Sequence, residues 1–410
     1  MKDPVIAITA ASYSGNKGAA AMLQSSIKQL KEKYPKLRVN LMSVYPSEDK
    51  KQLPYDFVKI ISTKPEQLVF LAFPLAILHK ICPPLRGLIG KNRIIKAYKK
   101  TDLVVDEAGI AFVDSRGFVM NTYAFICAAV PLLVGTPVVK YSQALGTFKN
   151  PYNRFLAKWI LPKLKLICAR GKITYENLKK IGITKNVKLC ADGAFTMPDE
   201  ERWTAAVNER CEKDEFYQNN VVGLSVSSVV QKKCEAMGID YKKSMVDFIE
   251  YLNGRGYGVL LIANAARIRS QKPRNNDLMI GDAIYEEISD KNLVRWYHEE
   301  MTAEEIREFI SHCRYLVASR FHAMVGSLQK KVPVLLIGWS HKYQEVMDMF
   351  ELGDYAVDFS GLSLDTLVVG FEHLEQDEEE VRRKLAKNYE KVRKSSYRNV
   401  EYISNVIDEL

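Results

Sequence analysis

The segment YLVASRFHAMVGSLQKKVPVLLI, residues 315–337, shows how the chain is built. It begins with a short apolar run, Tyr315–Ala318, and passes through a polar turn into a stretch whose apolar residues are spaced for one face of a helix. A second apolar run, Val332–Ile337, follows the helix. Strands joined through a crossover helix lie parallel in one sheet. The segment therefore predicts an α/β fold with a parallel sheet.

The same alternation of short apolar runs and longer helical patterns continues on both sides of this segment. Runs rich in Val, Ile and Leu are typical of strands buried in a parallel sheet. In the first half of the chain we expect strands at Val5–Thr9, Arg38–Ser43, Leu103–Val105, Pro137–Tyr141 and Leu166–Ala169. In the second half we expect strands at Val221–Val226, Gly258–Ala263, Leu293–Arg295, Tyr315–Ala318 and Val332–Ile337. Two doubly wound, Rossmann-like domains that face a cleft are the expected architecture.

The chain of 410 residues is longer than a single hydrophobic core normally supports, so two domains are expected. We place the first domain at residues 1–198 and the second at residues 215–374. The polar segment Asp199–Asn220, which has no strand pattern, is the expected linker. Residues 375–410 run from acidic to basic and carry apolar residues at four-residue spacing. This pattern predicts a helical tail that packs back on the N-terminal domain.

Seven cysteines occur without a CxxC pair and without zinc-like or disulfide-like spacing, which favours a reducing cytoplasm and indicates no metal site. The N-terminus leads directly into the apolar run Val5–Ala10 and lacks the features of a secretory signal. The only long apolar stretch that we recognise, Leu68–Leu78, has about half the residues needed to cross a bilayer. We therefore expect a cytoplasmic protein.

The charge is distributed unevenly along the chain. Residues 1–200 contain 31 Lys and Arg against 14 Asp and Glu, a net charge of +17, whereas the remainder carries −7. Seven basic residues and no acidic residue lie within residues 68–100. An apolar run beside a basic run is typical of binding to an anionic membrane surface, although a buried helix followed by a solvated basic helix gives the same pattern. Nucleic acid is disfavoured, because no zinc finger or aromatic RNA-binding motif is present.

Polar residues follow the expected strands of the N-terminal domain, where ligands bind in doubly wound folds. Gly15 and Asn16 lie in the first turn, ASYSGNKG, which either binds an anion or sugar hydroxyl at the following helix start or serves only as a turn. Asp106 and Glu107 follow the third strand, either as groups that bind or deprotonate a sugar hydroxyl or as a helix cap. Gln143 follows the fourth strand and is expected to point toward the same cleft.

Arg170 ends the last expected strand of this domain. An arginine at the tip of a buried strand needs an anionic partner, because a buried unpaired charge is costly. The partner is either a structural carboxylate or a substrate anion. We favour the substrate, so Arg170 is a candidate binding residue.

The strongest constellation is the turn SRFH at the start of the helix in the opening segment, which supplies Ser319, Arg320 and His322. Arg320 offers parallel N–H groups to a carboxylate or phosphate, and His322 can carry a proton near neutral pH. A lone histidine at a helix start is often only structural, but the neighbouring arginine at a strand end favours a functional role. His341 and Lys342, after the final strand, either complete an anion site or are plain surface residues.

The phrase SRFHAMVGSLQKKVPVLLIGWSHKYQEVM, residues 319–347, resembles the C-terminal signature of the polysaccharide pyruvyl transferase family. That signature consists of an [ST]-R-x-H-A turn, a helix, a strand that begins with proline, and a Tyr/Lys segment. The GNxG turn at residues 15–18, the SQALG segment at residues 142–146 and the turn at Arg170 with its LKKIG helix end are also similar to the family. These matches and a later AD dipeptide span most of residues 5–350.

The resemblance implies a GT-B-like fold and transfer of the enolpyruvyl unit of phosphoenolpyruvate onto a sugar of a surface-polysaccharide precursor, as a cyclic ketal, in capsule or exopolysaccharide synthesis. Phosphoenolpyruvate is then a co-substrate, and no further cofactor is expected. The acceptor is a glycan, and its lipid linkage stays open. Three departures from the family pattern lie in the N-terminal half: Ala19 or Ala20 replaces an acidic residue, DEAG replaces a glycine-rich strand end, and SQALG replaces GQGxG.

A site for phosphoenolpyruvate needs at least two cationic anchors, because its phosphate and carboxylate stand on adjacent positions. Arg320 and Arg170 are the expected anchors, with Lys342 as a third. His322 is the expected acid for the methylene carbon, and one of the two carboxylates after the third strand is the expected base.

Two other functions fit the same patterns. A GT-B glycosyltransferase could hold the diphosphate of a nucleotide sugar with Arg320 and Lys342. The Arg-x-His pair at a helix start suits a small dianion and an acid better than a leaving diphosphate. A non-catalytic scaffold at the membrane would also explain the basic N-terminal half. We expect a cytoplasmic transferase, and residues 68–100 leave open a peripheral position at the inner face of the membrane.

Overall fold

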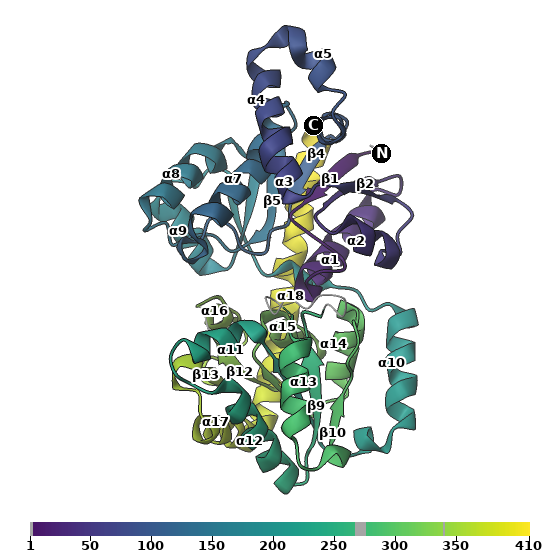
Figure 1. Cartoon of the computed structure of the whole chain (residues 1–410), viewed down its shortest axis with the longest axis vertical. Coiled ribbons are helices and arrows are strands. Elements are labelled where there is room, and N and C mark those ends of the chain that lie inside the picture. Colours follow the sequence, from purple (N-terminus) through teal and green to yellow (C-terminus); the bar gives the residue numbers. More distant parts are fainter. Residues whose placement is uncertain (1–2, 267–275, 339–340) are drawn as a thin grey trace. The chain divides into compact units, whose positions relative to one another are not determined.

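The computed structural model describes residues 3–266, 276–338 and 341–410 (Figure 1). Within it the chain divides into two compact units. The first unit contains Met1–Ser14, Ala19–Met197 and Arg393–Leu410, and the second contains Gly15–Gly18 and Pro198–Val392. The last residues of the chain therefore belong to the same unit as the first strands.

The first unit is built on a seven-stranded sheet in the order β3-β2-β1-β4-β5-β6-β7. All neighbouring strands in this sheet are parallel. The chain builds outward from β1 to β3 and then returns to the other side of β1, so the topological switch point lies between β1 and β4. The strands are β1 (Val5–Thr9), β2 (Arg38–Ser43), β3 (Val58–Ser62), β4 (Leu103–Asp106), β5 (Val138–Gln143), β6 (Leu166–Arg170) and β7 (Val187–Cys190).

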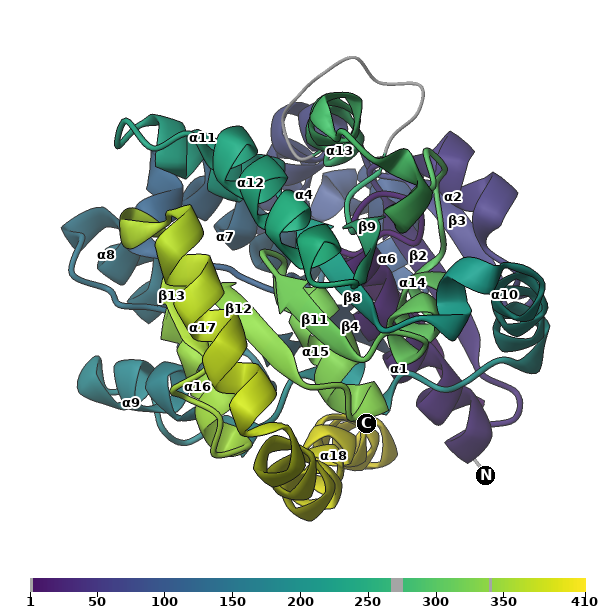
Figure 2. The ribbon, with the colours of Figure 1, turned by 90° about the horizontal axis from the view of Figure 1, so that it is seen from below.

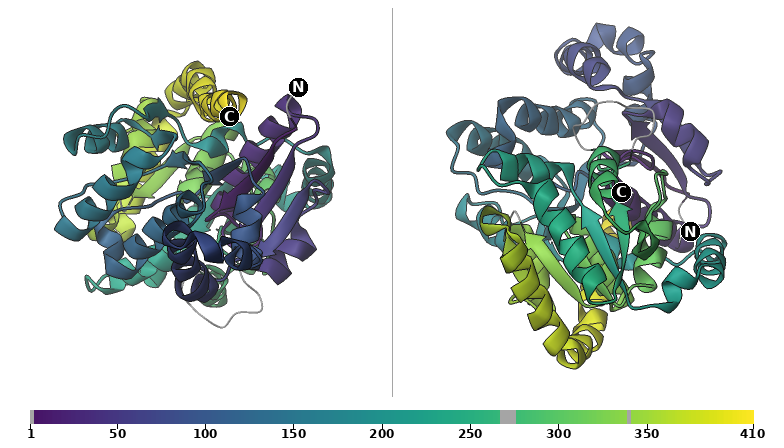
Figure 3. Two further views of the ribbon diagram at one scale, coloured as in Figure 1. Left: turned by 90° about the horizontal axis from the view of Figure 1, so that it is seen from above. Right: turned by 60° about the horizontal axis from the view of Figure 1, so that its bottom comes forward.

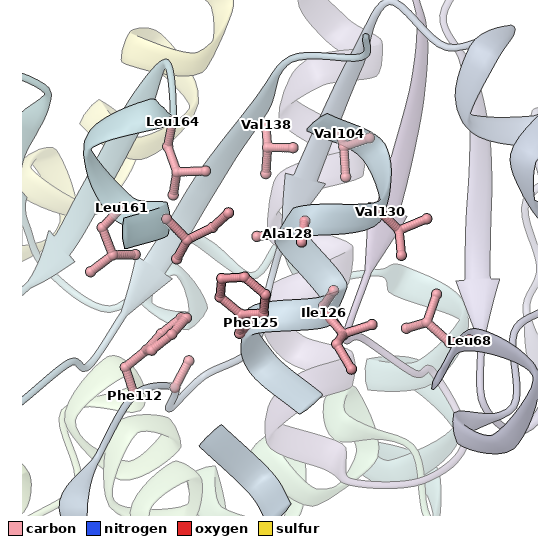
Figure 4. Packing of buried hydrophobic residues seen from close by; sticks show 14 of the residues in the cluster. Leu68, Val104, Phe112, Phe125, Ile126, Ala128, Val130, Val138, Leu161 and Leu164 are labelled. Carbon is pink, nitrogen blue, oxygen red and sulfur yellow. The ribbon is translucent and has the colours of Figure 1, made fainter. Parts of the chain in front are cut away.

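Helices connect these strands, and several of them cover one face of the sheet. They are α1 (Lys17–Lys33), α2 (Pro46–Gln52), α3 (Pro65–Gln67), α4 (Phe73–Ile81), α5 (Arg86–Ile89), α6 (Arg93–Lys99), α7 (Gly117–Leu133), α8 (Pro151–Ile160) and α9 (Lys172–Lys180). A π-helical turn, η1 (Leu68–Ala72), joins α3 to α4, so that residues 65–81 form one continuous helical segment. The main apolar core of this unit lies between the sheet and α4, α6, α7 and α8 (Figure 4).

Helix α7 is the centre of that core. Its Phe125, Ile126 and Val130 are buried and pack in one cluster with Val104 and Val138 of the sheet (Figure 4). The segment Asp114–Leu133, which contains α7, is also the one part of the described chain that is long and apolar enough to cross a membrane. Residues 125–131 of α7 are buried in the core, whereas Phe118 and Val119 near its start are exposed. Our expectation that residues 68–78 form the only long apolar stretch is therefore wrong.

The second unit contains a six-stranded parallel sheet in the order β10-β9-β8-β11-β12-β13. Its strands are β8 (Val221–Val226), β9 (Gly258–Ala263), β10 (Val294–Trp296), β11 (Tyr315–Ala318), β12 (Val334–Gly338) and β13 (Ala356–Asp358). Its helices are α10 (Glu201–Lys213), α11 (Ser228–Glu235), α12 (Tyr241–Gly254), α13 (Leu278–Glu287), α14 (Ala303–Ser311), α15 (Phe321–Lys330), α16 (His341–Met349) and α17 (Leu364–Gln376). Helices α12 and α17 lie side by side in this unit (Figure 2).

The expected α/β class and both parallel sheets are confirmed, and each expected strand overlaps an observed one with ends shifted by at most two residues. Strands β3, β7 and β13 were not predicted. All three lie at sheet edges, and their partly exposed residues break the continuous apolar run that marks a buried strand. The expected linker, Asp199–Asn220, instead contains helix α10 and a 3-10 turn, and it belongs to the second unit.

The C-terminal tail forms one long helix, α18 (Glu378–Glu409). Its last turns, yellow in Figure 3, are hydrogen-bonded to the segment after β7 in the first unit. Asn399 Nδ2 donates to the carbonyl oxygen of Ala191 at 3.0 Å, and Ser396 Oγ donates to that of Asp192 at 2.7 Å. Tyr34, directly after α1, donates to Asp408 at 2.7 Å. The helix therefore fixes the turn that follows the edge strand β7.

All seven cysteines are free thiols. Six of them are buried, and Cys82, just after α4, is partly exposed.

Replacement of Asn399 by alanine is expected to lower the free energy of unfolding by about 1–3 kcal/mol, because the buried carbonyl of Ala191 loses the shorter of its two hydrogen bonds and keeps only that from Ser142 Oγ, at 3.4 Å. Urea denaturation, with the midpoint of thermal unfolding as a second measure, tests this. The exposed neighbour Arg398, changed to alanine, is the control. Equal stability of the two variants would show that the tail does not fix the turn after β7.

Candidate functional site

The carboxyl ends of β8, β9 and β11 in the second unit carry a buried network of hydroxyl and amide groups. Ser225 Oγ donates to Asn264 Oδ1 at 2.8 Å. Ser319 Oγ and Tyr241 OH are 3.0 Å apart, and both side chains are buried. Ser319, which the sequence suggested as a substrate ligand, therefore has its hydroxyl engaged by Tyr241. Its observed role is to fix the turn between β11 and α15.

Arg320 follows Ser319 and forms an ion pair with the fully buried carboxylate of Asp277. Asp277 also accepts hydrogen bonds from the backbone N–H groups of Ser228, at 3.0 Å, and Ala265, at 2.9 Å. Burial lowers the pKa of Arg320, but the charge of Asp277 and the hydrogen bond to it outweigh burial, and the net shift is upward. The guanidinium is therefore charged and held in a fixed position at the start of α15.

An aromatic and basic cluster surrounds the first turn of α15. The ring of Phe321 lies edge-on to that of His322, with 5.0 Å between the ring centroids, and edge-on to that of Tyr343, at 5.3 Å. Lys342 Nζ lies 4.5 Å from the centroid of Phe321. The first turn of α16 thus brings Lys342 to the helix that carries His322. The side chain of His341, also a candidate, lies outside the described residues.

The glycine turn Gly15–Gly18 is grouped with this second unit. The side-chain oxygen of Asn16 accepts a hydrogen bond from the backbone N–H of Gly18 at 2.9 Å. A Cβ added to Gly18 would overlap Nδ1 of His322. Gly18 is therefore required to be glycine, because the imidazole occupies the space of a side chain. Two motifs about 300 residues apart in the sequence, GNKG and SRFH, meet at this point.

Asp106, at the end of β4 in the first unit, forms a buried ion pair with Lys140 of β5. Its Oδ2 is 2.6 Å from Lys140 Nζ, and both side chains are at most 1% exposed. Gln143 Nε2 donates to Oδ1 of Asp106 at 2.7 Å and to its carbonyl oxygen at 2.8 Å. Asp106 and Gln143 are thus brought together as the sequence suggested, but both oxygens of the carboxylate are engaged. This geometry favours a structural role for Asp106 over that of a base.

Glu107 is buried next to Asp106 and has a different environment. Ser26 Oγ of α1 donates to its Oε1, and no described residue lies within hydrogen-bonding distance of its Oε2. Burial raises the pKa of Glu107 to about 8; the hydrogen bond from Ser26 opposes this shift, and the negative charge of Asp106 adds to it. A carboxyl group with this pKa can give or take a proton near neutral pH. Of the two carboxylates after β4, Glu107 is the one suited to proton transfer.

Arg170, at the end of β6, pairs with Asp192. Its Nη1 lies 2.6 Å from Oδ2 of Asp192, and both side chains are almost completely buried. Oδ1 of Asp192 accepts from the backbone N–H of Ala194 at 2.8 Å and so also caps the turn after β7. Our preference for a substrate anion as the partner of Arg170 is corrected here, because the structure supplies the carboxylate itself.

Three partners in these networks were not found from the sequence: Asp277, Asp192 and Lys140. Asp277 and Asp192 are single acidic residues in loops, and nothing in their local pattern marks them as buried. Lys140 did carry a signal, because it interrupts the apolar run of β5. A lysine in the middle of a buried strand requires a carboxylate on a neighbouring strand. Among the described residues, no group of three or more His, Cys, Asp or Glu side chains is arranged to hold a metal ion.

Residues 16–341 match the family model described as polysaccharide pyruvyl transferase. This match covers most of the chain and includes the SRFH turn and all of the glycine turn except Gly15. The chain belongs to the polysaccharide pyruvyl transferase family. Membership places the protein among the pyruvyl transferases of polysaccharide biosynthesis.

One curated relative is the amylovoran biosynthesis protein AmsJ of Erwinia amylovora. It is 21% identical over 395 residues, which cover 92% of this chain and 94% of AmsJ. The two proteins therefore correspond over nearly their whole lengths.

Several solved structures share the fold. The S. aureus MnaA–UDP co-structure has a TM-score of 0.63 and 12% sequence identity. The match covers 99% of this chain and 97% of the MnaA chain. The UDP-GlcNAc 2-epimerase from Neisseria meningitidis bound to UDP-GlcNAc has a TM-score of 0.62 and 12% sequence identity. The match covers 98% of this chain and 99% of the epimerase chain. Anabaena Alr3699/HepE in complex with UDP and glucose has a TM-score of 0.57 and 13% sequence identity. The match covers 99% of this chain and 100% of the HepE chain. The expected GT-B-like fold is thereby confirmed.

The raised pKa of Glu107 makes a prediction for stability. The ordinary pKa is 4.5 and the folded value is about 8, so between these pH values the folded chain holds a proton that the unfolded chain has lost. The free energy of unfolding should therefore fall as pH rises through this window. In Glu107→Gln this contribution is absent, and wild type and variant should diverge by on the order of 3–5 kcal/mol across the window.

Urea denaturation at several pH values between about 5 and 8 measures the divergence. The exposed residue Glu66, changed to glutamine, is the control, and its pH dependence should follow the wild type. If the curves for Glu107→Gln and wild type run parallel, Glu107 ionises normally in the folded protein.

Proposed function

We propose that this protein transfers the enolpyruvyl unit of phosphoenolpyruvate onto two hydroxyls of a sugar in a surface-polysaccharide precursor, forming a pyruvate ketal. The observation that carries the proposal is the cluster at the start of α15. There Arg320, fixed by a buried carboxylate, is followed two residues later by His322, and Lys342 lies against the same helix turn. Family membership supports pyruvyl transfer in polysaccharide biosynthesis.

The substrate chemistry requires cations and an acid in one place. Phosphoenolpyruvate carries a phosphate and a carboxylate, so a site for it needs positive charge that stays fixed while the substrate reacts. Arg320 is charged and immobilised by Asp277, and Lys342 adds a second cation. The positive end of the α15 helix dipole adds attraction for an anion. Arg320 and Lys342 are the proposed anchors, and Arg170 is replaced in this role because it already pairs with Asp192.

The proposed reaction has two stages. His322 gives a proton to the methylene carbon of phosphoenolpyruvate, and the positive charge that develops at C2 is attacked by the first sugar hydroxyl, which loses its proton to a base. The second hydroxyl then attacks C2 and gives its proton to His322, the bond between C2 and the phosphate oxygen breaks so that inorganic phosphate leaves, and the ketal ring closes. Glu107, with a pKa raised to about 8, is the proposed base for a hydroxyl proton in preference to Asp106.

A glycosyltransferase that uses a nucleotide sugar is the alternative. The structures that share the fold contain UDP, UDP with glucose, or UDP-GlcNAc, which keeps this class of donor open for the same architecture. The Arg-x-His pair at a helix start favours phosphoenolpyruvate, because a small dianion and a proton donor are needed at the same point. We further propose that the protein works in the cytoplasm, where its seven thiols stay reduced.

Donor binding tests the proposal first. Calorimetric titration of phosphoenolpyruvate into the wild type should show binding, and Arg320→Lys and Lys342→Gln should each weaken it by about tenfold or more, because a bidentate or direct ionic contact is lost. Arg320→Lys is preferred to Arg320→Ala, which would leave the buried carboxylate of Asp277 unpaired. Arg383→Lys, in the exposed part of α18, is the matched control.

Thermal-shift measurements with phosphoenolpyruvate and a panel of nucleotide sugars distinguish the two donor classes. Stabilisation by a nucleotide sugar alone would reject the pyruvyl donor in favour of the alternative. Stabilisation by phosphoenolpyruvate, followed by phosphate release when a glycan extract is added, is the result that we expect.

The close approach of Gly18 to His322 gives a second prediction. Gly18→Ala forces the imidazole to move, because the new Cβ would overlap Nδ1. Displacement of a catalytic acid by about 1 Å is expected to lower the rate of transfer about a hundredfold, with the thermal unfolding midpoint little changed. Gly254→Ala, at a glycine with nothing within 4 Å of its added Cβ, is the control. Equal rates in the two variants would remove His322 from the proposed mechanism.

A further inference from the structure

The helical segment formed by α3, η1 and α4 presents an apolar face to the outside. Leu68, Ala72 and Ala76 on its inner face are fully buried in the core of the first unit. The large apolar side chains on its other face are Phe70 (80% exposed), Leu71 (49%), Ile77 (37%), Leu78 (40%) and Ile81 (69%). A surface helix normally turns its charged side outward. The α3–η1–α4 segment is instead apolar on both faces, and packing within the first unit does not account for the apolar side chains on its outer face.

The segment also lacks charge. From Leu68 to Ile77 it contains no ionisable side chain. His79 is buried, and burial together with the positive charge of Lys99 lowers its pKa, so that it stays neutral at neutral pH. The 3-10 turn Pro83–Leu85 and helix α5 continue the same surface with Leu85 (40% exposed) and Leu88 (68%). Figure 1 shows α4 and α5 projecting from the rest of the first unit.

Aromatic contacts connect this face to α7 and α8. Phe73 of α4 contacts Phe125 of α7, with 6.5 Å between ring centroids, and Phe125 contacts Trp159 of α8 at 5.0 Å. Trp159 is 50% exposed, and its neighbour Phe155 is 62% exposed. Helices α4 and α8 therefore both pack against α7, which itself exposes Phe118 (65%) and Val119 (74%). Patches of this kind on a protein surface usually mark an interaction site.

Basic side chains accompany the apolar ones. Every lysine and arginine between Leu68 and Lys100 is exposed, and no acidic residue occurs in this range. They are Lys80, Arg86, Lys91, Arg93, Lys96, Lys99 and Lys100. On α8 the ammonium group of Lys163 lies 5.2 Å from the centroid of Trp159. A tryptophan beside a lysine is typical of the level at which lipid headgroups meet acyl chains.

We infer that this face, which consists of the exposed apolar side chains of residues 70–88 with Phe155 and Trp159, binds the surface of a bilayer that contains anionic lipid. The apolar side chains enter the boundary between headgroups and acyl chains, and the lysines and arginines bind lipid phosphates. The segment lies along the bilayer and does not cross it, because its inner face is packed against the core of the unit.

Charge is the reason to choose a bilayer over a protein partner. A face shared between two copies of this chain would bring two sets of seven basic residues together without acidic partners, which is unfavourable. An anionic lipid surface satisfies the apolar face and its basic neighbours at once. The inference does not depend on the donor of the proposed reaction. It gives the proposed enzyme access to acceptors that are carried on lipid.

Vesicle flotation tests the inference on the full-length protein. The wild type should float with vesicles of phosphatidylcholine and phosphatidylglycerol, should bind weakly to phosphatidylcholine alone, and should be released as salt is raised. Two triple variants should each lower the bound fraction by about tenfold or more, through lost apolar insertion or lost charge. They are Phe70→Ser with Ile81→Ser and Leu88→Ser, and Lys91→Glu with Lys96→Glu and Lys99→Glu.

Matched triple variants on other surfaces serve as controls and should bind like the wild type. The apolar control is Met237→Ser with Met279→Ser and Val369→Ser, all at exposed positions of the second unit. The charge control is Lys391→Glu with Lys394→Glu and Arg398→Glu, at exposed positions of α18. Thermal unfolding shows that each variant folds. Titration with phosphoenolpyruvate shows separately whether donor binding is intact, so that failure of the membrane inference is distinguished from failure of the proposed function.

Three outcomes would overturn the inference. The first is a wild type that does not float with anionic vesicles. The second is flotation that both triple variants retain. The third is a dimer in sedimentation velocity that the Phe70→Ser triple variant dissociates, since the apolar face would then be an interface between copies of the chain.

Discussion

Charged groups at the carboxyl ends of the strands are the constraint on which the rest of the structure depends. Parallel strands end under helices, away from water, so a charge placed there must find its partner inside the protein. The chain meets this requirement with buried ion pairs: Lys140 with Asp106, Arg170 with Asp192, and Arg320 with Asp277. Loss of one partner from such a pair costs about 3–5 kcal/mol, which is a large part of the stability of a domain.

The ion pairs also distinguish charged groups that hold the fold together from groups that are suited to substrate binding or proton transfer. A guanidinium held by a buried carboxylate cannot turn to follow a substrate, so Arg320 offers a fixed position to an incoming anion. Glu107 has no cationic partner among the groups that shift its pKa, and it keeps its proton to a pH far above that of an ordinary carboxyl. The departures from the family pattern at DEAG and SQALG fall within the network around Asp106 and Gln143.

The sequence predicted the parts of the molecule that depend on local pattern. Buried strands such as Val221–Val226 form continuous apolar runs, and the SRFH turn lies where a strand gives way to a helix. It did not predict the edge strand β7, whose Lys188 and Leu189 are exposed. The partners of Arg170 and Arg320 were also missed. Asp192 and Asp277 reach them only through the tertiary fold, and no local spacing encodes a contact between residues so far apart.

The single partly exposed thiol of the chain lies at the end of the apolar segment. Cys82 follows Ile81 directly, whereas the other six cysteines are buried. An alkylating reagent applied to the native protein therefore reacts there first, since a buried thiol is both inaccessible and held in its protonated form. The wild-type chain thus carries its own attachment point for a polarity-sensitive fluorophore at the outermost helices of the first unit. The emission of such a label reports whether its surroundings are water or hydrocarbon without any change to the sequence.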